Sequence, residues 1–202
     1  RRKLAPDVRQ HLGPDVQVHE VGELGNAIDD LGAAGKSLRL DKTTAPDWVA
    51  QRSKSAGLTM VAGDDPCQLA KARKNPVELD GMRTAHRRDG GALVRFFSWL
   101  DAAATDGGVD EMAAADHLET LRGSGPHFMG LSFPTISGSG PNGAIVHYRV
   151  TPETNRRLEP GSLYLVDSGG QYLDGTTDVT RTIAIGTPDD EMRDRFTRVL
   201  KG

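Results

Sequence analysis

The 202-residue sequence has little of what marks disulfide-rich, membrane or nucleic-acid-binding proteins. Its single cysteine, Cys67, can form no internal disulfide and no CxxC-type metal site. No apolar run approaches the roughly 18 residues that a membrane-spanning helix needs. The 25 Lys and Arg nearly balance the 28 Asp and Glu, for a net charge of −3, which argues against binding to nucleic acid or to a membrane surface. The cysteine usage favours a reducing compartment, and we expect a cytoplasmic location.

The sequence does contain enough apolar material for a core. Hydrophobic residues make up 37% of it, and the 24 glycines bring this share to about half, as in an ordinary globular protein. The length predicts one to two domains. The chain begins at Arg1 rather than at a methionine and stops at Gly202 directly after a predicted helix, so we expect a fragment of a longer protein.

The first sixty residues predict an α/β unit. Segments with strand period alternate with segments of helical spacing, at 16–21, 24–31, 37–40, from Pro46 onward, and at 58–61. No Gly-rich phosphate loop accompanies them, so we assign this unit no chemistry. Asp64-Asp65-Pro66 combines an N-cap candidate with a proline at the first helical position, which places a domain boundary between 1–63 and 64–202.

The remainder predicts helices followed by strands. One long helix is expected from Pro76 to Ala104, and Asp110 is a plausible N-cap for a second helix that ends near Leu121. Strands are expected at 131–136, 144–148, 163–167 and 179–185, before a final helix that begins at Pro188.

The last two predicted strands form a hairpin that carries two aspartates, Asp167 and Asp178. If 171–174 form a four-residue loop, the two carboxylates lie opposite one another. A tight turn at Asp174-Gly175 would instead pair Asp167 with Thr182.

In the first register, the repulsion between the two carboxylates must be offset. A shared proton, the guanidinium of Arg181, or one or two divalent cations could do so, and carboxylates suit Mn, Mg or Zn. The plainer interpretation is a pair of solvated aspartates near a turn.

Four ordered stretches resemble the creatinase/aminopeptidase P family, the pita-bread metallopeptidases of family M24. The hairpin from Asp167-Ser168-Gly169 to Thr182 is similar to that family's metal-binding hairpin, in the version of the three-domain Xaa-Pro aminopeptidases. The other three stretches are 71–86, which resembles the entry to the catalytic domain, 131–148, which resembles the strand pair carrying a substrate-site histidine, and 152–156. Arg149 is a small departure from the pattern.

The resemblance implies an α/β (α+β) chain with the end of a creatinase-like N-terminal domain at 1–63 and the first half of a pita-bread catalytic domain at 64–202. It implies that Asp167 chelates one metal ion and that Asp178 bridges two. The ions would be divalent, with Mn²⁺ expected and Zn²⁺ or Co²⁺ as alternatives. The family's remaining ligands, one His and two Glu, would lie beyond Gly202. By the same resemblance, His147 is the catalytic histidine that binds the substrate or the oxyanion.

The implied function is a metallo-aminopeptidase that removes the residue before a penultimate proline, with this chain inactive by itself. Its partner would be such a peptide, with no nucleic acid or membrane, and a homodimer is expected by analogy. One alternative is a non-catalytic peptide- or protein-binding member of the same fold. Another is a hydrolase of the prolidase or creatinase type.

Overall fold

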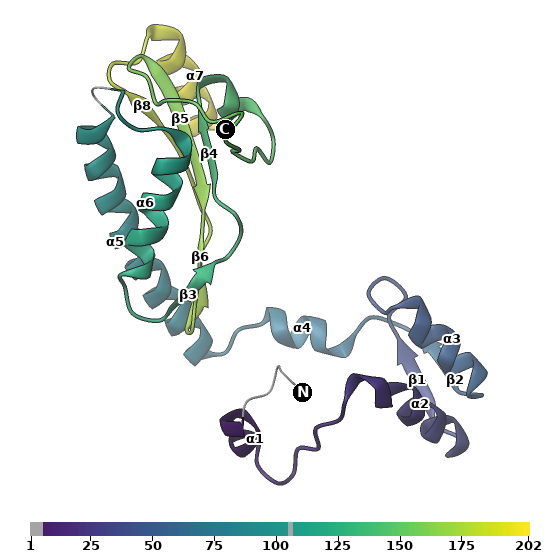
Figure 1. The fold of residues 1–202 in the computed structure, drawn as a ribbon. Coiled ribbons are helices and arrows are strands. Elements are labelled where there is room, and N and C mark those ends of the chain that lie inside the picture. The colour runs from purple at the N-terminus through teal and green to yellow at the C-terminus, as the bar shows by residue number, and fades with distance from the viewer. Residues whose placement is uncertain (1–5, 105–106) are drawn as a thin grey trace. The chain divides into compact units, whose positions relative to one another are not determined.

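A computed structural model describes residues 6–104 and 107–202 (Figure 1). By its internal contacts the chain divides into two units, Arg1–Arg73 and Lys74–Gly202. The boundary that the sequence places at 63/64 stays a prediction. In the described ranges, no helix is long and apolar enough to cross a membrane.

The first unit is a small α/β arrangement around two parallel strands. β1 (Ser37–Leu40) pairs in parallel with β2 (Thr59–Ala62), and α3 (Asp47–Ser55) makes the crossover between them. The other elements of this unit are α1 (Pro6–Leu12), the 3₁₀ helix η1 (Val21–Glu23), α2 (Leu24–Ala33) and α4 (Pro66–Ala72). Within this unit, the helices predicted at 24–31 and from Pro46 onward and the strands predicted at 37–40 and 58–61 are confirmed, and each begins within one residue of its predicted start.

The strand predicted at 16–21 is wrong. Residues 16–20 have no regular structure, and η1 begins at Val21. Val16 and Val21 are 48% and 89% exposed, so the alternating pattern buries no face here. In the described part of this unit, β1 and β2 pair only with each other, so residues 16–20 add no strand to this sheet.

The second unit begins with two packed helices that follow their predictions closely. α5 (Pro76–Ala103) starts at a capping box, in which Asn75 accepts from the N–H of Glu78 and the Glu78 carboxylate accepts from the N–H of Asn75. α6 (Glu111–Gly123) starts at Asp110, whose carboxylate accepts from the N–H of Ala113 at 2.8 Å. The start of each of the two helices is therefore set by a local capping residue.

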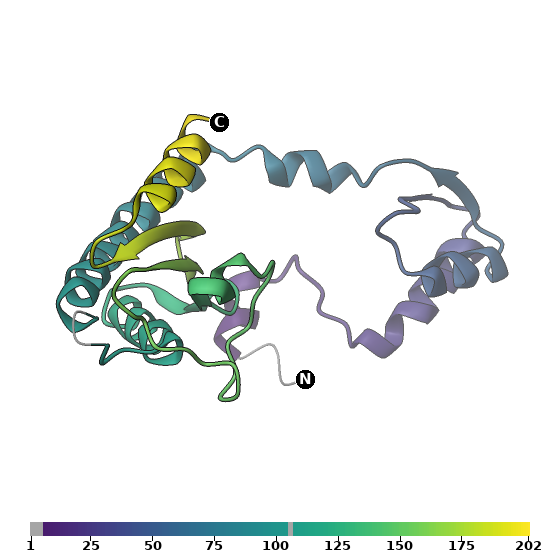
Figure 2. The same cartoon turned by 90° about the horizontal axis from the view of Figure 1, so that it is seen from above.

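Two antiparallel three-stranded sheets complete the second unit, with strand orders β4-β5-β8 and β3-β6-β7. In chain order the elements are β3 (Phe128–Leu131), β4 (Ile136–Ser139), the 3₁₀ helix η2 (Gly140–Ala144), β5 (Ser162–Ser168), β6 (Gly170–Tyr172), β7 (Gly175–Thr176), β8 (Val179–Ile185) and α7 (Asp190–Lys201). The helices α5 and α6 lie against the strands in both views (Figures 1 and 2). The expected α/β (α+β) class is confirmed.

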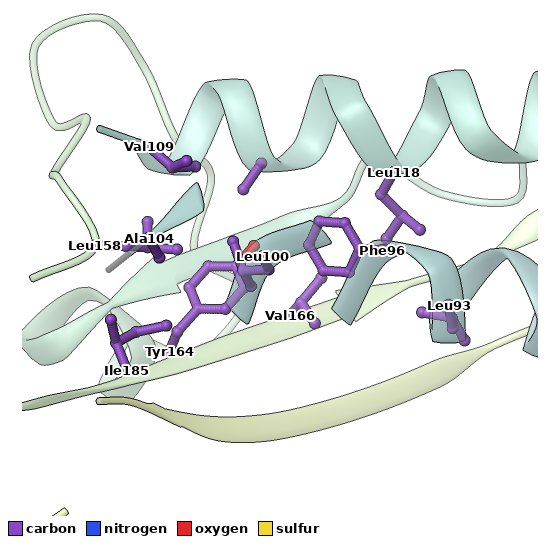
Figure 3. Close-up of a cluster of buried hydrophobic side chains, with 11 residues drawn as sticks. Leu93, Phe96, Leu100, Ala104, Val109, Leu118, Leu158, Tyr164, Val166 and Ile185 are labelled. Carbon is purple, nitrogen blue, oxygen red and sulfur yellow. The ribbon is translucent and has the colours of Figure 1, made fainter. Parts of the chain in front are cut away.

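The core of the second unit lies between these helices and β5. Phe96 and Leu100 of α5 and Leu118 of α6 pack against Tyr164 and Val166, and all are at most 1% exposed (Figure 3). Tyr164 and Val166 alternate with residues that face the other side of the sheet, as the period of a strand requires. Position 167 therefore points away from this core.

Two of the predicted strands are corrected. The strand at 131–136 is two elements, because Leu131 ends β3 and Ile136 begins β4 while the chain passes from one sheet to the other. The strand at 144–148 does not form: η2 ends at Ala144 and a turn follows. Ile145 and Val146 are 52% and 82% exposed, so their apolar pattern is not matched by burial.

The hairpin adopts neither predicted register. Tyr172 pairs with Gly175, so the turn consists of Leu173 and Asp174. β5 and β8 keep the register that this turn sets. Asp167 is therefore paired with Thr180. The four strands β5 to β8 thus form one long ribbon whose base lies in one sheet and whose tip lies in the other.

Side chains of α5 hold the tip of this ribbon. Arg88 makes a bidentate pair with Asp174, at 3.0 and 2.9 Å, and its guanidinium lies 5.2 Å from the centre of the Tyr172 ring. Hydrogen bonding from Arg88 lowers the pKa of Asp174. The Tyr172 hydroxyl donates to Asp89 at 2.8 Å, and Asp89 accepts from Arg122 of α6 at 2.7 and 3.0 Å. One buried cluster therefore joins α5, α6 and the ribbon tip.

Asp89→Asn is expected to destabilise the second unit by about 3–5 kcal/mol, because it leaves the Arg122 guanidinium buried without its countercharge. Asp89 and Arg122 are each 1% exposed. The measurement is urea unfolding in a Trp48→Phe background, so that Trp99 reports the second unit alone. Asp116→Asn, at an exposed position of α6, is the control and should shift stability by less than about 0.5 kcal/mol. Equal effects of the two substitutions would contradict the prediction.

Candidate metal centre

The three residues singled out from the sequence line one pocket of about 330 Å³. Asp167 comes from β5, Asp178 lies one residue before β8, and His147 comes from the turn after η2. The rest of the lining is Phe133, Pro134, Ile136 and Arg149. Side chains from separate segments between Phe133 and Asp178 thus bring two carboxylates and one imidazole to the same pocket.

The ribbon register explains why the two aspartates share a face. Asp167 is paired with Thr180, and Asp178 lies two residues from Thr180 along the same strand direction. Residues two apart point to the same side, so Asp178 is the diagonal neighbour of Asp167. Diagonal neighbours lie about 7–8 Å apart, whereas direct partners lie about 4.5–5.5 Å apart. This offset lessens the repulsion that a directly opposed pair would suffer.

The ribbon changes sheets at Gly169, between the two aspartates. The N–H of Ser132 donates to the Gly169 carbonyl at 3.0 Å, and the Ser132 hydroxyl donates to the Thr177 carbonyl at 3.0 Å. The N–H of Thr177 donates to the Gly170 carbonyl at 2.9 Å. A Cβ at position 169 would collide with the Thr177 carbonyl oxygen and the Ser132 hydroxyl. Glycine is therefore required where the backbone segments come this close.

Asp167 supplies the test of whether a cation fits this pocket. Its Oδ1 atom is buried and has no hydrogen-bond partner. An unpaired buried carboxylate oxygen is costly, and a bound cation would satisfy it. Asp178, which is exposed toward solvent, lines the same pocket and adds a second oxygen donor. The two side chains therefore fit one side of a divalent-metal site.

The described residues do not complete such a site. Among residues 6–104 and 107–202, no group of three or more His, Cys, Asp or Glu side chains could hold a metal ion. His147 lies in the pocket but is not part of a three-ligand cluster. The predicted roles of Asp167 and Asp178 as metal ligands, and of His147 as the catalytic histidine, stay predictions.

His147 has an unusual backbone conformation. The N–H of Tyr148 donates to the Ile145 carbonyl at 3.2 Å, which closes a turn in which His147 is the third residue. Its φ is +54°, in the left-handed region that side chains other than glycine rarely adopt. Such a conformation costs about 1–3 kcal/mol and persists where the surroundings enforce it.

Sequence reasoning missed Glu111, which is fully buried beneath this turn. Its position directly after the N-cap Asp110 is typical of a surface acid that favours the helix dipole. The sequence position of Glu111 therefore indicated a solvated side chain, whereas the side chain is buried. Only the contacts of its carboxylate with the 139–156 segment reveal its role in the structure.

Two family models together cover nearly the whole sequence. The Creatinase/Prolidase N-terminal domain matches residues 1–78, and Metallopeptidase family M24 matches residues 80–202. The chain belongs to metallopeptidase family M24. The predicted family is thus confirmed, and the second unit, with its ribbon and its two aspartates, coincides with the M24 match.

Curated relatives in fungi carry the description "Probable Xaa-Pro aminopeptidase P". The protein of Aspergillus niger is 42% identical over 99% of this chain and 34% of its own length, and that of Tuber melanosporum is 41% identical over 99% and 35%. This chain therefore spans about a third of the length of the curated relatives it matches.

Solved structures agree with this M24 assignment. The X-prolyl aminopeptidase of Caenorhabditis elegans, described as a cytosolic enzyme with a di-nuclear active site, is 33% identical with a TM-score of 0.82, over 94% of this chain and 32% of that one. Prolidase from Pyrococcus furiosus, at 21% identity and a TM-score of 0.70 over 92% of this chain and 51% of its own, shares the fold.

Gly169→Ala is expected to destabilise the M24 unit by about 2 kcal/mol or more, because the new methyl group meets the Thr177 backbone carbonyl, which cannot move aside as a flexible side chain could. Gly90→Ala is the matched control. Gly90 lies inside α5 with open space around its Cβ position, so the same substitution there should stabilise by up to about 1 kcal/mol. Urea unfolding followed by Trp99 fluorescence in the Trp48→Phe background measures both. Effects of the same sign would contradict the close approach at Gly169.

Proposed function

We propose that the intact protein is a metal-dependent aminopeptidase that removes the N-terminal residue from peptides with proline in the second position. The observation that carries this proposal is the convergence of Asp167, Asp178 and His147 on one pocket, with the buried Oδ1 of Asp167 left unpaired. The substrate class comes from the fungal relatives described as Xaa-Pro aminopeptidase P.

Asp167 and Asp178 would hold a pair of divalent cations, with Asp167 bound to one and Asp178 shared by both. We propose Mn²⁺, with Zn²⁺ or Co²⁺ as alternatives, because carboxylates suit hard and borderline ions. Such a pair supplies Lewis acidity and an activated water for hydrolysis. The dinuclear site described for the C. elegans enzyme supports a pair rather than a single ion.

His147 would act from the opposite wall of the pocket. Its imidazole N–H would donate a hydrogen bond to the scissile carbonyl, where negative charge develops during attack. Phe133, Pro134 and Ile136 line the same pocket and would provide apolar contacts for the substrate. The side chains of this chain thus bind and polarise the substrate.

Other functions on this fold are less well supported. A non-catalytic binding protein has no need of two carboxylates on one face with an unpaired buried oxygen. A prolidase shares the fold, but the solved prolidase described above is 21% identical, against 42% for the A. niger relative. We also propose a cytoplasmic location, in line with the cytosolic C. elegans enzyme. The homodimer implied by the family resemblance stays a proposal.

Purified residues 1–202 are expected not to hydrolyse an Xaa-Pro peptide, because two of five expected ligands cannot hold a metal pair. The assay is release of alanine from Ala-Pro-Ala with added Mn²⁺. The background is set by the same chain carrying Asp178→Asn. Turnover above that background would disprove the inactivity of the isolated chain.

In the intact protein, Asp178→Asn is expected to lower kcat by more than about 100-fold, beyond the 10–100-fold typical of residues that only support ligands. It should also reduce the metal content, measured by elemental analysis after dialysis. Asp116→Asn, at an exposed position of α6, should change neither quantity. Full activity and metal content in the Asp178 variant would rule out its bridging role.

A further inference from the structure

Glu111 is a fully buried carboxylate whose partners are all neutral donors. It accepts hydrogen bonds from the N–H of Ser139 at 2.6 Å and of Arg156 at 3.1 Å. It also accepts from the Tyr148 hydroxyl at 2.9 Å and from the Asn142 amide at 2.9 and 3.1 Å. None of the ion pairs found among residues 6–104 and 107–202 includes it. Four donors therefore converge on one buried charge.

Two of these donors enclose the turn that carries His147. Asn142 lies five residues before His147 and Tyr148 directly follows it, and the Asn142 amide also donates to the Tyr148 hydroxyl at 2.8 Å. Tyr148 is 5% exposed, whereas Val146 on the other side of His147 is 82% exposed. The segment 142–148 is thus bound at both ends to one carboxylate, and His147, next to its C-terminal end, lines the pocket.

This fastening accounts for the left-handed backbone of His147. A free loop would relax to a negative φ, since the left-handed region is unfavourable for a side chain with a Cβ. With Asn142 and Tyr148 both fixed to Glu111, the turn between them cannot relax without breaking buried hydrogen bonds. Backbone relaxation would move the imidazole relative to Asp167 and Asp178.

We propose that Glu111 is a positioning residue for catalysis. Through Tyr148 and Asn142 it holds His147 in the backbone conformation that keeps the imidazole at the pocket of Asp167 and Asp178. This inference rests on the proposed role of His147 as a donor to the substrate. Glu111 itself touches neither the pocket nor the two aspartates among the contacts described.

The test uses Tyr148→Phe in the intact, metal-loaded protein, because this change removes one hydroxyl and keeps the buried ring. Tyr164→Phe is the matched control: Tyr164 is also buried, and its hydroxyl bonds to Ser137 at 2.7 Å, outside the His147 turn. His147→Ala and the double variant Tyr148→Phe with His147→Ala complete the set. Turnover of Ala-Pro-Ala gives kcat and KM, elemental analysis gives metal content, and thermal unfolding gives stability.

His147→Ala is expected to lower kcat by about 10²–10³-fold, as for loss of a single donor to a developing oxyanion. Tyr148→Phe should lower kcat by about tenfold with KM and metal content unchanged, because the imidazole is displaced rather than removed. Tyr164→Phe should lower the melting temperature by a similar amount and keep kcat within about twofold. In the His147→Ala background, Tyr148→Phe should have no further effect on kcat.

The outcomes separate this inference from the proposed function. Full activity of His147→Ala would refute the proposed role of His147, and the positioning inference with it. If His147→Ala is impaired but Tyr148→Phe matches Tyr164→Phe, the proposed function stands and the positioning inference is overturned. An equal effect of Tyr148→Phe with and without His147 also overturns it. Glu111→Gln, which turns one acceptor into a donor facing other donors, should lower kcat further than Tyr148→Phe.

Discussion

The candidate site depends on the register of one antiparallel ribbon. β5 and β8 run in step with the two-residue turn at Leu173-Asp174, and this alignment sets Asp178 diagonally across from Asp167. A shift by one residue would turn one of the two side chains to the other face of the sheet. The ribbon also supplies Tyr164 and Val166 to the core, so the same alignment that buries apolar side chains on one face places the carboxylates on the other.

Buried carboxylates fix this ribbon and the loop opposite it to the helices. Asp89 of α5 binds Arg122 and Tyr172 near the ribbon tip, and Glu111 of α6 binds the segment that carries His147. Burial of such groups is costly unless every lone pair is used, so each cluster tolerates few alternative arrangements. The helices therefore act as rigid supports from which both walls of the pocket are positioned.

The sequence was most informative where structure is set locally. The ends of α5 and α6 follow from capping residues and helical spacing, and β8 follows from its alternating pattern and its bounding turn. The hairpin pattern singled out Asp167 and Asp178, and resemblance to a family suggested their roles and added His147. The structure brings all three residues to one pocket.

The features that the sequence did not predict depend on contacts between residues that are distant in the sequence. The pattern at 16–21 looks like a strand, but a strand forms only where another can pair with it. The register of the hairpin is fixed by the sheet change at Gly169 and by the bidentate ion pair between Arg88 and Asp174. Neither feature can be inferred from the spacing of residues in the sequence. Glu111 was missed because the same residue type at a helix start is usually solvated.

The proposed binding of a cation at the unpaired oxygen of Asp167 would link metal occupancy to folding. Only the folded chain places this atom in a buried site beside Asp178, so the unfolded chain has no comparable affinity for a cation. Any cation that binds there adds its binding free energy to the stability of the folded state. The metal would then be part of the architecture as well as of the chemistry, and the free metal concentration would help to set how much of the protein is folded.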